Sequence, residues 1–157
     1  MKIEITNQQK KHRIHPSHIK QTTQWLMNQV QALDKQKKWS ELSLVLLDDR
    51  GITEINKTYL GKQNPTDVIS FAYPPPVPEH TQGYIGEVFV NIECAFLEGN
   101  QRNGHDHELA LYIAHGCHHL MGATDHTPSK RNQMLRVETN WLQQAEAQGS
   151  LKTLIKG

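Results

Sequence analysis

Two periods of hydrophobic residues run along the chain, one typical of strands and one typical of helices. Ile3 and Ile5 alternate with polar residues, which predicts a short strand near the N-terminus. After Pro16, apolar residues recur every three or four positions as far as Leu33, which indicates one buried face of a helix. Over the whole sequence, the two periods predict strands at about 2–6, 42–47, 67–73 and 84–91, and helices at about 16–33, 49–60, 92–102, 106–121 and 128–147.

The order and character of these elements predict an α+β fold. The strand at 42–47 is apolar on both faces, which is typical of a central strand that is covered on each side. KQKKWS, residues 35–40, is expected to be a linking loop, and the prolines within 74–83 predict a second, exposed loop. We therefore expect a small four-stranded mixed sheet covered by about five helices.

The chain length fits one domain, which we expect to span residues 1–157. With 157 residues and 18.0 kDa, the chain can bury a hydrophobic core without disulfides. No apolar run approaches the roughly 20 residues of a membrane-spanning helix, and the first residues lack the apolar stretch of a signal peptide. Cys94 and Cys117 are too few for a disulfide framework, so a cytoplasmic protein is expected.

Charge is unevenly distributed along the chain, although the formal net value is only +1. Residues 1–40 contain eight Lys or Arg side chains against two acidic ones, and the rest contains nine against fourteen. A basic segment can attract phosphate, but on charge alone a solvated helix face is the simpler interpretation. The ten histidines are more informative, because several of them are clustered.

The segment 107–127, HELALYIAHGCHHLMGATDHT, predicts a metal site at the end of a buried helix. His115 and His119 are four residues apart, so they project from one helix face, where two imidazoles can bind the same ion. Gly122 follows three residues later and can end the helix in the left-handed conformation. The pattern therefore predicts two helical ligands followed by a chain reversal.

The returning chain supplies the third ligand, since Asp125 and His126 both come within reach of the histidine pair. A ligand set of imidazole and carboxylate favours zinc, followed by other first-row divalent ions. Magnesium and calcium prefer more oxygen ligands. His118 lies off the face of the pair and is expected near the rim of the site. Cys117 points away from the pair and is expected to be an inert buried thiol.

Three motifs follow one another along the sequence: YLGKQNPTDVISF at 59–71, IGEVFV at 85–90 and HGCHHLMGATDH at 115–126. In the same order they resemble Y-R-G-K-x-x-P-T-D-V-L-S-F, I-G-D-I-x-I and HGxLHLxGYDH of the YbeY-type endoribonucleases, the rRNA maturation factors found widely in bacteria. Several matched blocks in register are far more specific than any one of them.

The resemblance implies a cytoplasmic hydrolase that uses one zinc ion per chain to cut single-stranded RNA, in 16S rRNA 3′-end maturation and ribosome quality control. It implies an α+β fold, and it makes His115 and His119 the first two metal ligands. Its implied partners are the 16S rRNA precursor and the ribosomal subunit, with a ribosomal protein or a GTPase in addition, and no membrane. Lys10, Lys11 and Arg13 of the basic segment then become candidate contacts to the RNA backbone.

The sequence departs from the family pattern at three positions. The family's third histidine falls six residues after the second, where this chain has Asp125. Either Asp125 takes that place without a gap, or one inserted residue lets His126 bind; the ungapped alignment favours Asp125. Leu60 stands where many members have an arginine, which puts phosphate clamping by that side chain in doubt. His118 replaces a leucine, which predicts a wetter site.

Spacing alone does not identify the general base. Glu108 lies two turns before His115 on nearly the same face, where it is either a partner of the ligands or a solvated, helix-capping carboxylate. A zincin-type metalloprotease also uses H-x-x-x-H, but it carries a glutamate directly after the first histidine, where this chain has Gly116. The remaining alternative is a non-catalytic ribosome-assembly factor, in which a structural metal holds the helix end.

Overall fold

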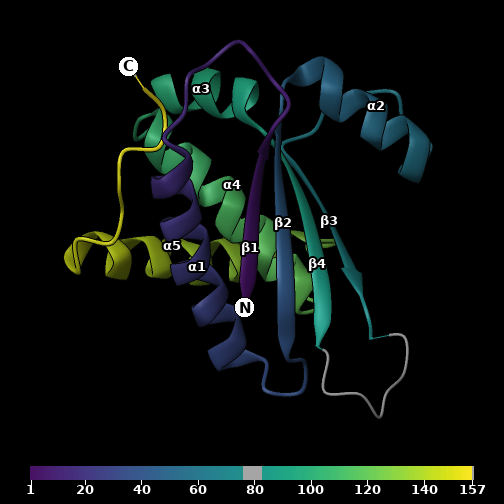
Figure 1. Cartoon of the computed structure of the whole chain (residues 1–157), viewed down its shortest axis with the longest axis vertical. Helices are drawn as coiled ribbons and strands as arrows, with labels where there is room; N and C mark the ends of the chain where they lie inside the picture. Colours follow the sequence, from purple (N-terminus) through teal and green to yellow (C-terminus); the bar gives the residue numbers. More distant parts are fainter. Residues whose placement is uncertain (76–82, 157) are drawn as a thin grey trace.

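The computed structural model describes residues 1–75 and 83–156, which form one four-stranded sheet and five helices (Figure 1). The predicted α+β class is therefore confirmed. No helix within the described part of the chain is both long and apolar enough to cross a membrane. In chain order the elements are β1 (Lys2–Asn7), α1 (Pro16–Leu33), β2 (Trp39–Leu47), α2 (Asp49–Leu60), β3 (Val68–Tyr73), β4 (Tyr84–Asn91), α3 (Ile92–Asn100), α4 (His105–Leu120) and α5 (Pro128–Ala147).

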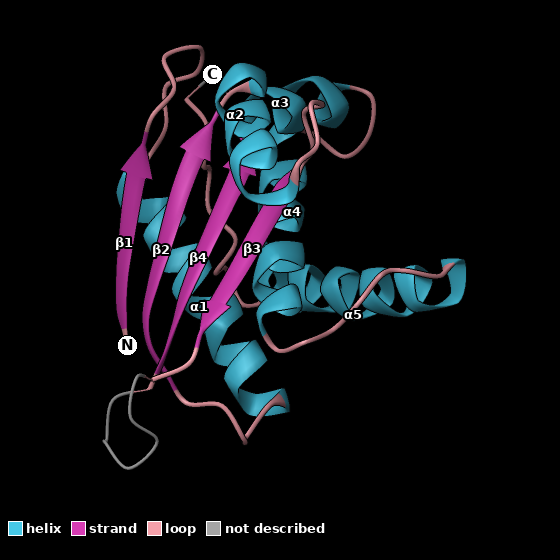
Figure 2. Ribbon diagram, turned by 90° about the vertical axis from the view of Figure 1, so that its right-hand side faces the viewer, coloured by secondary structure: helices cyan, strands magenta, loops and turns pink. Residues whose placement is uncertain are grey.

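The sheet is mixed, with the strand order β1-β2-β4-β3 (Figure 2). β1, β2 and β4 run parallel, whereas β3 pairs antiparallel with β4 and forms one edge. Leu44 and Leu46 on β2 are fully buried, and so is Val88 on the neighbouring β4. The apolar character of 42–47 thus predicted its central position correctly.

The predicted boundaries agree with the structure within two residues, except at the start of β2. This strand begins at Trp39, inside the segment expected to be a loop, because Trp39 pairs with Tyr84 of β4 and its side chain is buried. The predicted loop at 74–83 falls mainly on residues 76–82, which lie outside the described part of the chain.

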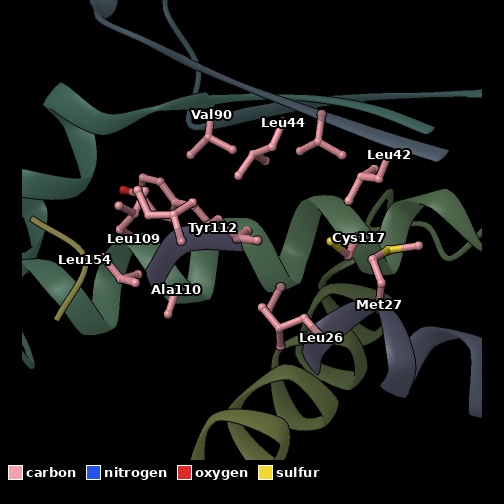
Figure 3. Close-up of a cluster of buried hydrophobic side chains, with 14 of the residues drawn as sticks. Leu26, Met27, Leu42, Leu44, Val90, Leu109, Ala110, Tyr112, Cys117 and Leu154 are labelled. Atoms are coloured by element: carbon pink, nitrogen blue, oxygen red, sulfur yellow. The ribbon is translucent and has the colours of Figure 1, made fainter. Parts of the chain in front are cut away.

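The core lies between the sheet and the two helices α1 and α4. Figure 3 shows Leu26 and Met27 of α1 and Leu42 and Leu44 of β2 among the side chains of this cluster. A smaller cluster on the opposite face lies under α2. Helix α4 contacts β3, β4, α1, α3 and α5, which explains why its sequence is apolar around much of its circumference. The fold therefore holds α4 firmly, and its last two turns carry the predicted histidines.

Candidate metal centre

The end of α4 brings the predicted metal ligands together. The Nε2 atoms of His115 and His119 lie 2.9 Å apart, with the two rings nearly perpendicular. The chain reverses after the helix at Gly122, whose φ of 96° is left-handed, as predicted. This reversal places Oδ2 of Asp125 3.4 Å from Nε2 of His115 and 3.7 Å from Nε2 of His119. Three potential ligand atoms therefore converge at one point.

The hydrogen bonds of the two rings determine which nitrogens are free. Nδ1 of His119 donates to the backbone oxygen of Ala123 at 2.9 Å, since a carbonyl can only accept. Nδ1 of His115 donates to the carboxylate of Glu138, 3.0 Å from each oxygen. Neutral rings held in this way present two Nε2 lone pairs to each other at 2.9 Å. Such an arrangement is repulsive unless a proton or a metal ion lies between the lone pairs.

The charges around the pair also attract a cation. Burial acts to lower the pKa of His115, but the hydrogen bond and charge of Glu138, with the charges of Asp67 and Asp125, outweigh burial and raise it. Burial acts to raise the pKa of Asp125, yet the neighbouring His119 and His115 lower it overall, so this carboxylate is ionised at neutral pH. Because a metal ion competes with the proton on the imidazoles, its binding weakens as the pH falls.

The donor set fits a divalent first-row metal ion. Two ligands at about 2.0–2.1 Å from a tetrahedral ion lie roughly 3.3–3.4 Å apart. The three donor–donor distances in the site are 2.9, 3.4 and 3.7 Å, so small side-chain shifts suffice to reach that geometry. Two imidazoles and one carboxylate suit such an ion better than magnesium or calcium. An ion held by these three residues would retain a position for water or substrate.

A carboxylate that was not predicted from the sequence fixes His115. Glu138 of α5 is only 1% exposed and accepts hydrogen bonds from His115 and His118. Burial acts to raise its pKa, but these two imidazole donors outweigh burial and lower it, so the carboxylate stays ionised. The available signal was a charged residue inside the apolar stripe of α5, whose buried positions are Met134, Glu138, Trp141, Leu142 and Ala145.

His118 does not lie near the rim of the site, contrary to the sequence-based expectation. Its side chain is buried, its Nδ1 donates to Oε2 of Glu138 at 2.8 Å, and its ring packs edge-on against Trp141. The expected wetter site is therefore wrong on this point, because α5 supplies the polar partner that water would otherwise provide. Cys117 is fully buried, and burial raises the pKa of its thiol to about 12, which confirms the expected inert core position.

Gly116 allows α4 to approach the sheet closely. A Cβ atom at this position would lie 2.6 Å from Cγ1 of Val88 and 2.8 Å from Cγ2 of Val68. The backbone oxygen of Gly116 accepts a hydrogen bond from Oγ of Ser70 at 2.7 Å, which ties the helix to β3. A glutamate, as zincin-type metalloproteases carry here, has no room against these side chains.

A hollow of about 640 Å³ opens beside the histidine pair. The end of α2 and the segment that follows contribute Leu60, which is 49% exposed, and Lys62, and β3 contributes Phe71. Asp67 also lines the hollow, as does His126. His126, however, is not part of the group whose ligand atoms converge, which consists of the two helical histidines and the carboxylate that follows them.

Glu108 is in a different environment from either of the two expected ones. Its side chain is 2% exposed and accepts a hydrogen bond from Nη1 of Arg102 at 2.8 Å. The buried carboxylate in the first turn of α4 therefore pairs with an exposed arginine, and it is neither solvated nor among the residues lining the hollow.

The basic residues Lys10, Lys11 and Arg13 lie between β1 and α1. Nζ of Lys11 donates to Oε2 of Glu93 at 2.7 Å, so part of the charge of this segment is already paired. None of the three residues lines the hollow beside the histidines. The structure thus separates the predicted RNA-backbone contacts from the predicted metal ligands.

The fold and the site together define a class of protein, in which a helix packed on a mixed sheet presents a His-x-x-x-His pair and a returning carboxylate, groups that could bind a metal ion. A model of the family described as endoribonuclease YbeY matches residues 4–146. The chain belongs to the endoribonuclease YbeY family, as its three motifs indicated.

Individual relatives agree with this assignment. The endoribonuclease YbeY of Syntrophomonas wolfei is 33% identical over 150 residues, which cover 88% of this chain and 93% of that protein. The endoribonuclease YbeY of Geobacter sulfurreducens is 31% identical over 140 residues, which cover 88% and 89%. The solution structure of TM1509 from Thermotoga maritima is similar with a TM-score of 0.51 over 96% of each chain at 19% identity, a likeness that supports the fold.

Proposed function

We propose that the protein is a zinc-dependent endoribonuclease that cleaves single-stranded RNA. The observation that carries the proposal is the convergence of two Nε2 lone pairs and a carboxylate oxygen, 2.9 to 3.7 Å apart, beside a hollow that could admit a phosphodiester. Family membership supports RNA as the substrate, because the relatives are named endoribonucleases.

The cellular role follows from the same assignment. The enzyme acts in the cytoplasm on the 3′ end of the 16S rRNA precursor and in ribosome quality control. Its partners are the rRNA and the ribosomal subunit, with a ribosomal protein or a GTPase in addition.

Each residue of the site has a distinct task. His115, His119 and Asp125 would hold one zinc ion, which supplies a Lewis acid that lowers the pKa of water and neutralises charge on phosphate. Glu138 keeps the proton of His115 on Nδ1, so that Nε2 is the atom offered to the metal. Lys62 brings a positive charge into the hollow, where it would attract the phosphodiester.

Cleavage assays with purified, zinc-loaded protein test the proposed function. We expect a single-stranded RNA with the sequence of a 16S 3′ end to be cut, and the same strand annealed to its complement to resist. EDTA should stop the reaction, and added zinc should restore it. Failure of the folded, zinc-loaded protein to cut the single strand would overturn the proposal, and cleavage that EDTA leaves undiminished would overturn its metal dependence.

The third ligand can be identified by comparing Asp125→Ala with His126→Ala. Because only Asp125 converges with the two helical histidines, we expect Asp125→Ala to lose bound metal and cleavage, and His126→Ala to retain both. Metal content per chain, measured by mass spectrometry, gives the answer independently of activity. The opposite result would assign the ligand to His126, and full metal content in both variants would contradict both candidates.

A non-catalytic ribosome-assembly factor is the second candidate, because Leu60, which stands where the family resemblance implies an arginine, lines the hollow. In that case the metal would only hold the end of α4 in place. The metalloprotease alternative is disfavoured, because Gly116 offers no carboxylate and the packing around it admits none.

A further inference from the structure

Two exposed tyrosines, one near the end of α2 and one at the end of β3, lie on either side of a phenylalanine of β3. Of the chain's three Phe, four Tyr and three Trp residues, all within the described part of the chain, Tyr59 and Tyr73 are the two that are exposed, at 61% and 45%. Both flank Phe71, with centroid distances of 5.4 Å from Tyr59 and 6.5 Å from Tyr73. We call Tyr59, Phe71 and Tyr73 the aromatic row.

Contacts with the core and with a neighbouring strand fix the positions of the rings in the aromatic row. Phe71 packs edge-on against Phe89, which is buried in the smaller core cluster. Tyr73 donates a hydrogen bond from its hydroxyl to Oε1 of Glu87 at 3.1 Å. The rings are thus positioned before any ligand arrives, and Tyr59 and Tyr73 remain exposed among the described residues.

The aromatic row is continuous with the proposed catalytic hollow. Phe71, at its centre, lines that hollow together with His115 and His119, and Leu60 on the same wall follows Tyr59 directly. A nucleic acid strand with one phosphodiester at the histidines and a neighbouring nucleotide at Phe71 would meet Tyr59 and Tyr73 on either side of that ring. Every unpaired base has a flat π-face that stacks on an aromatic side chain, whereas the bases of a duplex are already stacked on one another.

We propose that Tyr59, Phe71 and Tyr73 form a stacking subsite for the unpaired bases that flank the cleaved phosphodiester. The inference rests on the proposed function for the identity of its ligand, which is RNA. It also gives a physical reason for a single-strand preference. Stacking on these rings releases no counterions, so the part of the affinity that the aromatic row supplies would depend less on salt than phosphate contacts do.

Binding of a non-cleavable oligonucleotide tests this subsite apart from catalysis. The probe is a fluorescent, single-stranded 2′-O-methyl RNA, measured by anisotropy on the full-length protein with and without zinc. Tyr59→Leu and Tyr73→Leu keep an apolar side chain and remove the ring, and we expect each to weaken binding about fivefold or more. Tyr59→Phe keeps the ring and should bind as the wild type does. Tyr73→Phe keeps the ring but loses its hydrogen bond to Glu87, and it should bind more tightly than Tyr73→Leu. Leu97→Ala, a change at another exposed apolar residue, on α3, is the surface control.

A second probe separates base stacking from other contacts. The same oligonucleotide with abasic flanking positions should bind the wild type more weakly, and the two Leu variants should no longer distinguish it from the intact probe. Equal affinity of the Leu variants and the wild type for the intact probe would overturn the proposal. A wild type that sediments as a dimer, with Leu variants that sediment as monomers, would also overturn it, because the row would then be a contact between copies of this chain.

The outcomes also distinguish this subsite from the proposed function. If the wild type binds the probe through these rings but cuts no RNA, the nuclease proposal fails and the stacking subsite stands. If the wild type cuts single-stranded RNA and the Leu variants bind unchanged, the subsite alone fails.

Discussion

Replacement of His115 by Ala is expected to remove the bound metal and to reduce RNA cleavage at least about 10³-fold, while the chain remains folded. The reason is geometric, because Nε2 of His115 is the atom closest to both other donors, 2.9 Å from His119 and 3.4 Å from Asp125. The apolar packing of α4 does not depend on this side chain, which is part of the hollow and not of the core cluster. Metal content, circular dichroism and cleavage should be measured on one preparation.

His119→Ala serves as the matched variant, because His115 also bonds the buried Glu138 and its removal leaves that carboxylate with one partner fewer. Among the described residues His119 bonds the carbonyl of Ala123 outside the site and no buried carboxylate, so its loss should disturb the fold less than that of His115 and still empty the site. A folded variant that keeps its metal would contradict the assignment of these histidines as ligands. A variant that cuts RNA at the wild-type rate would contradict metal-dependent cleavage at this site. If both variants unfold, the metal has a structural role, and this result would support the assembly-factor alternative.

Glu138→Gln is expected to lower the metal affinity by about 10- to 100-fold. The ionised carboxylate accepts hydrogen bonds from Nδ1 of His115 and Nδ1 of His118 at the same time. An amide can accept with its oxygen only, and its NH₂ group then faces the other ring, where it favours the tautomer with Nδ1 unprotonated. When that ring is His115, the proton moves to Nε2 and competes directly with the metal.

Metal titration of the metal-free variant measures this effect, and a thermal unfolding curve shows whether the fold is preserved. Glu146→Gln, at an exposed position of the same helix, is the control and should bind metal as the wild type does. Glu138→Ala should in addition destabilise the protein by roughly 1–3 kcal/mol, because two buried imidazole donors lose their acceptor. Unchanged metal affinity of Glu138→Gln, with the fold intact, would show that Glu138 does not position His115.

The parts of the site that are local in sequence could be predicted. The spacing of His115 and His119 fixes their common face through the helical period alone, and Gly122 marks the reversal because its backbone needs a positive φ. The sheet was predictable for the same reason, since strand periodicity and the apolar character of 42–47 are local signals. These features depend on the nearest few residues, which the sequence displays directly.

The parts that depend on tertiary packing could not be predicted. Glu138 lies 23 residues after His115 and reaches it only because α5 packs against α4. His118 was expected near the rim, and this prediction failed because its buried partner, Glu138, belongs to that distant helix. The choice between Asp125 and His126 depends on how the turn after Gly122 folds, and neighbouring residues on a turn have nearly the same sequence distance to the site. The burial of Glu108 could not be predicted either, because it depends on an ion pair with Arg102, which precedes α4.

The enclosure of α4 has a consequence for how the enzyme matures. The proposed ligands lie at the C-terminal end of α4, whose other turns pack against apolar side chains on several sides. The chain can therefore fold before any ion is available. Under the proposed function, a chain made without metal would be folded but inactive, and capture of the ion would activate it without refolding.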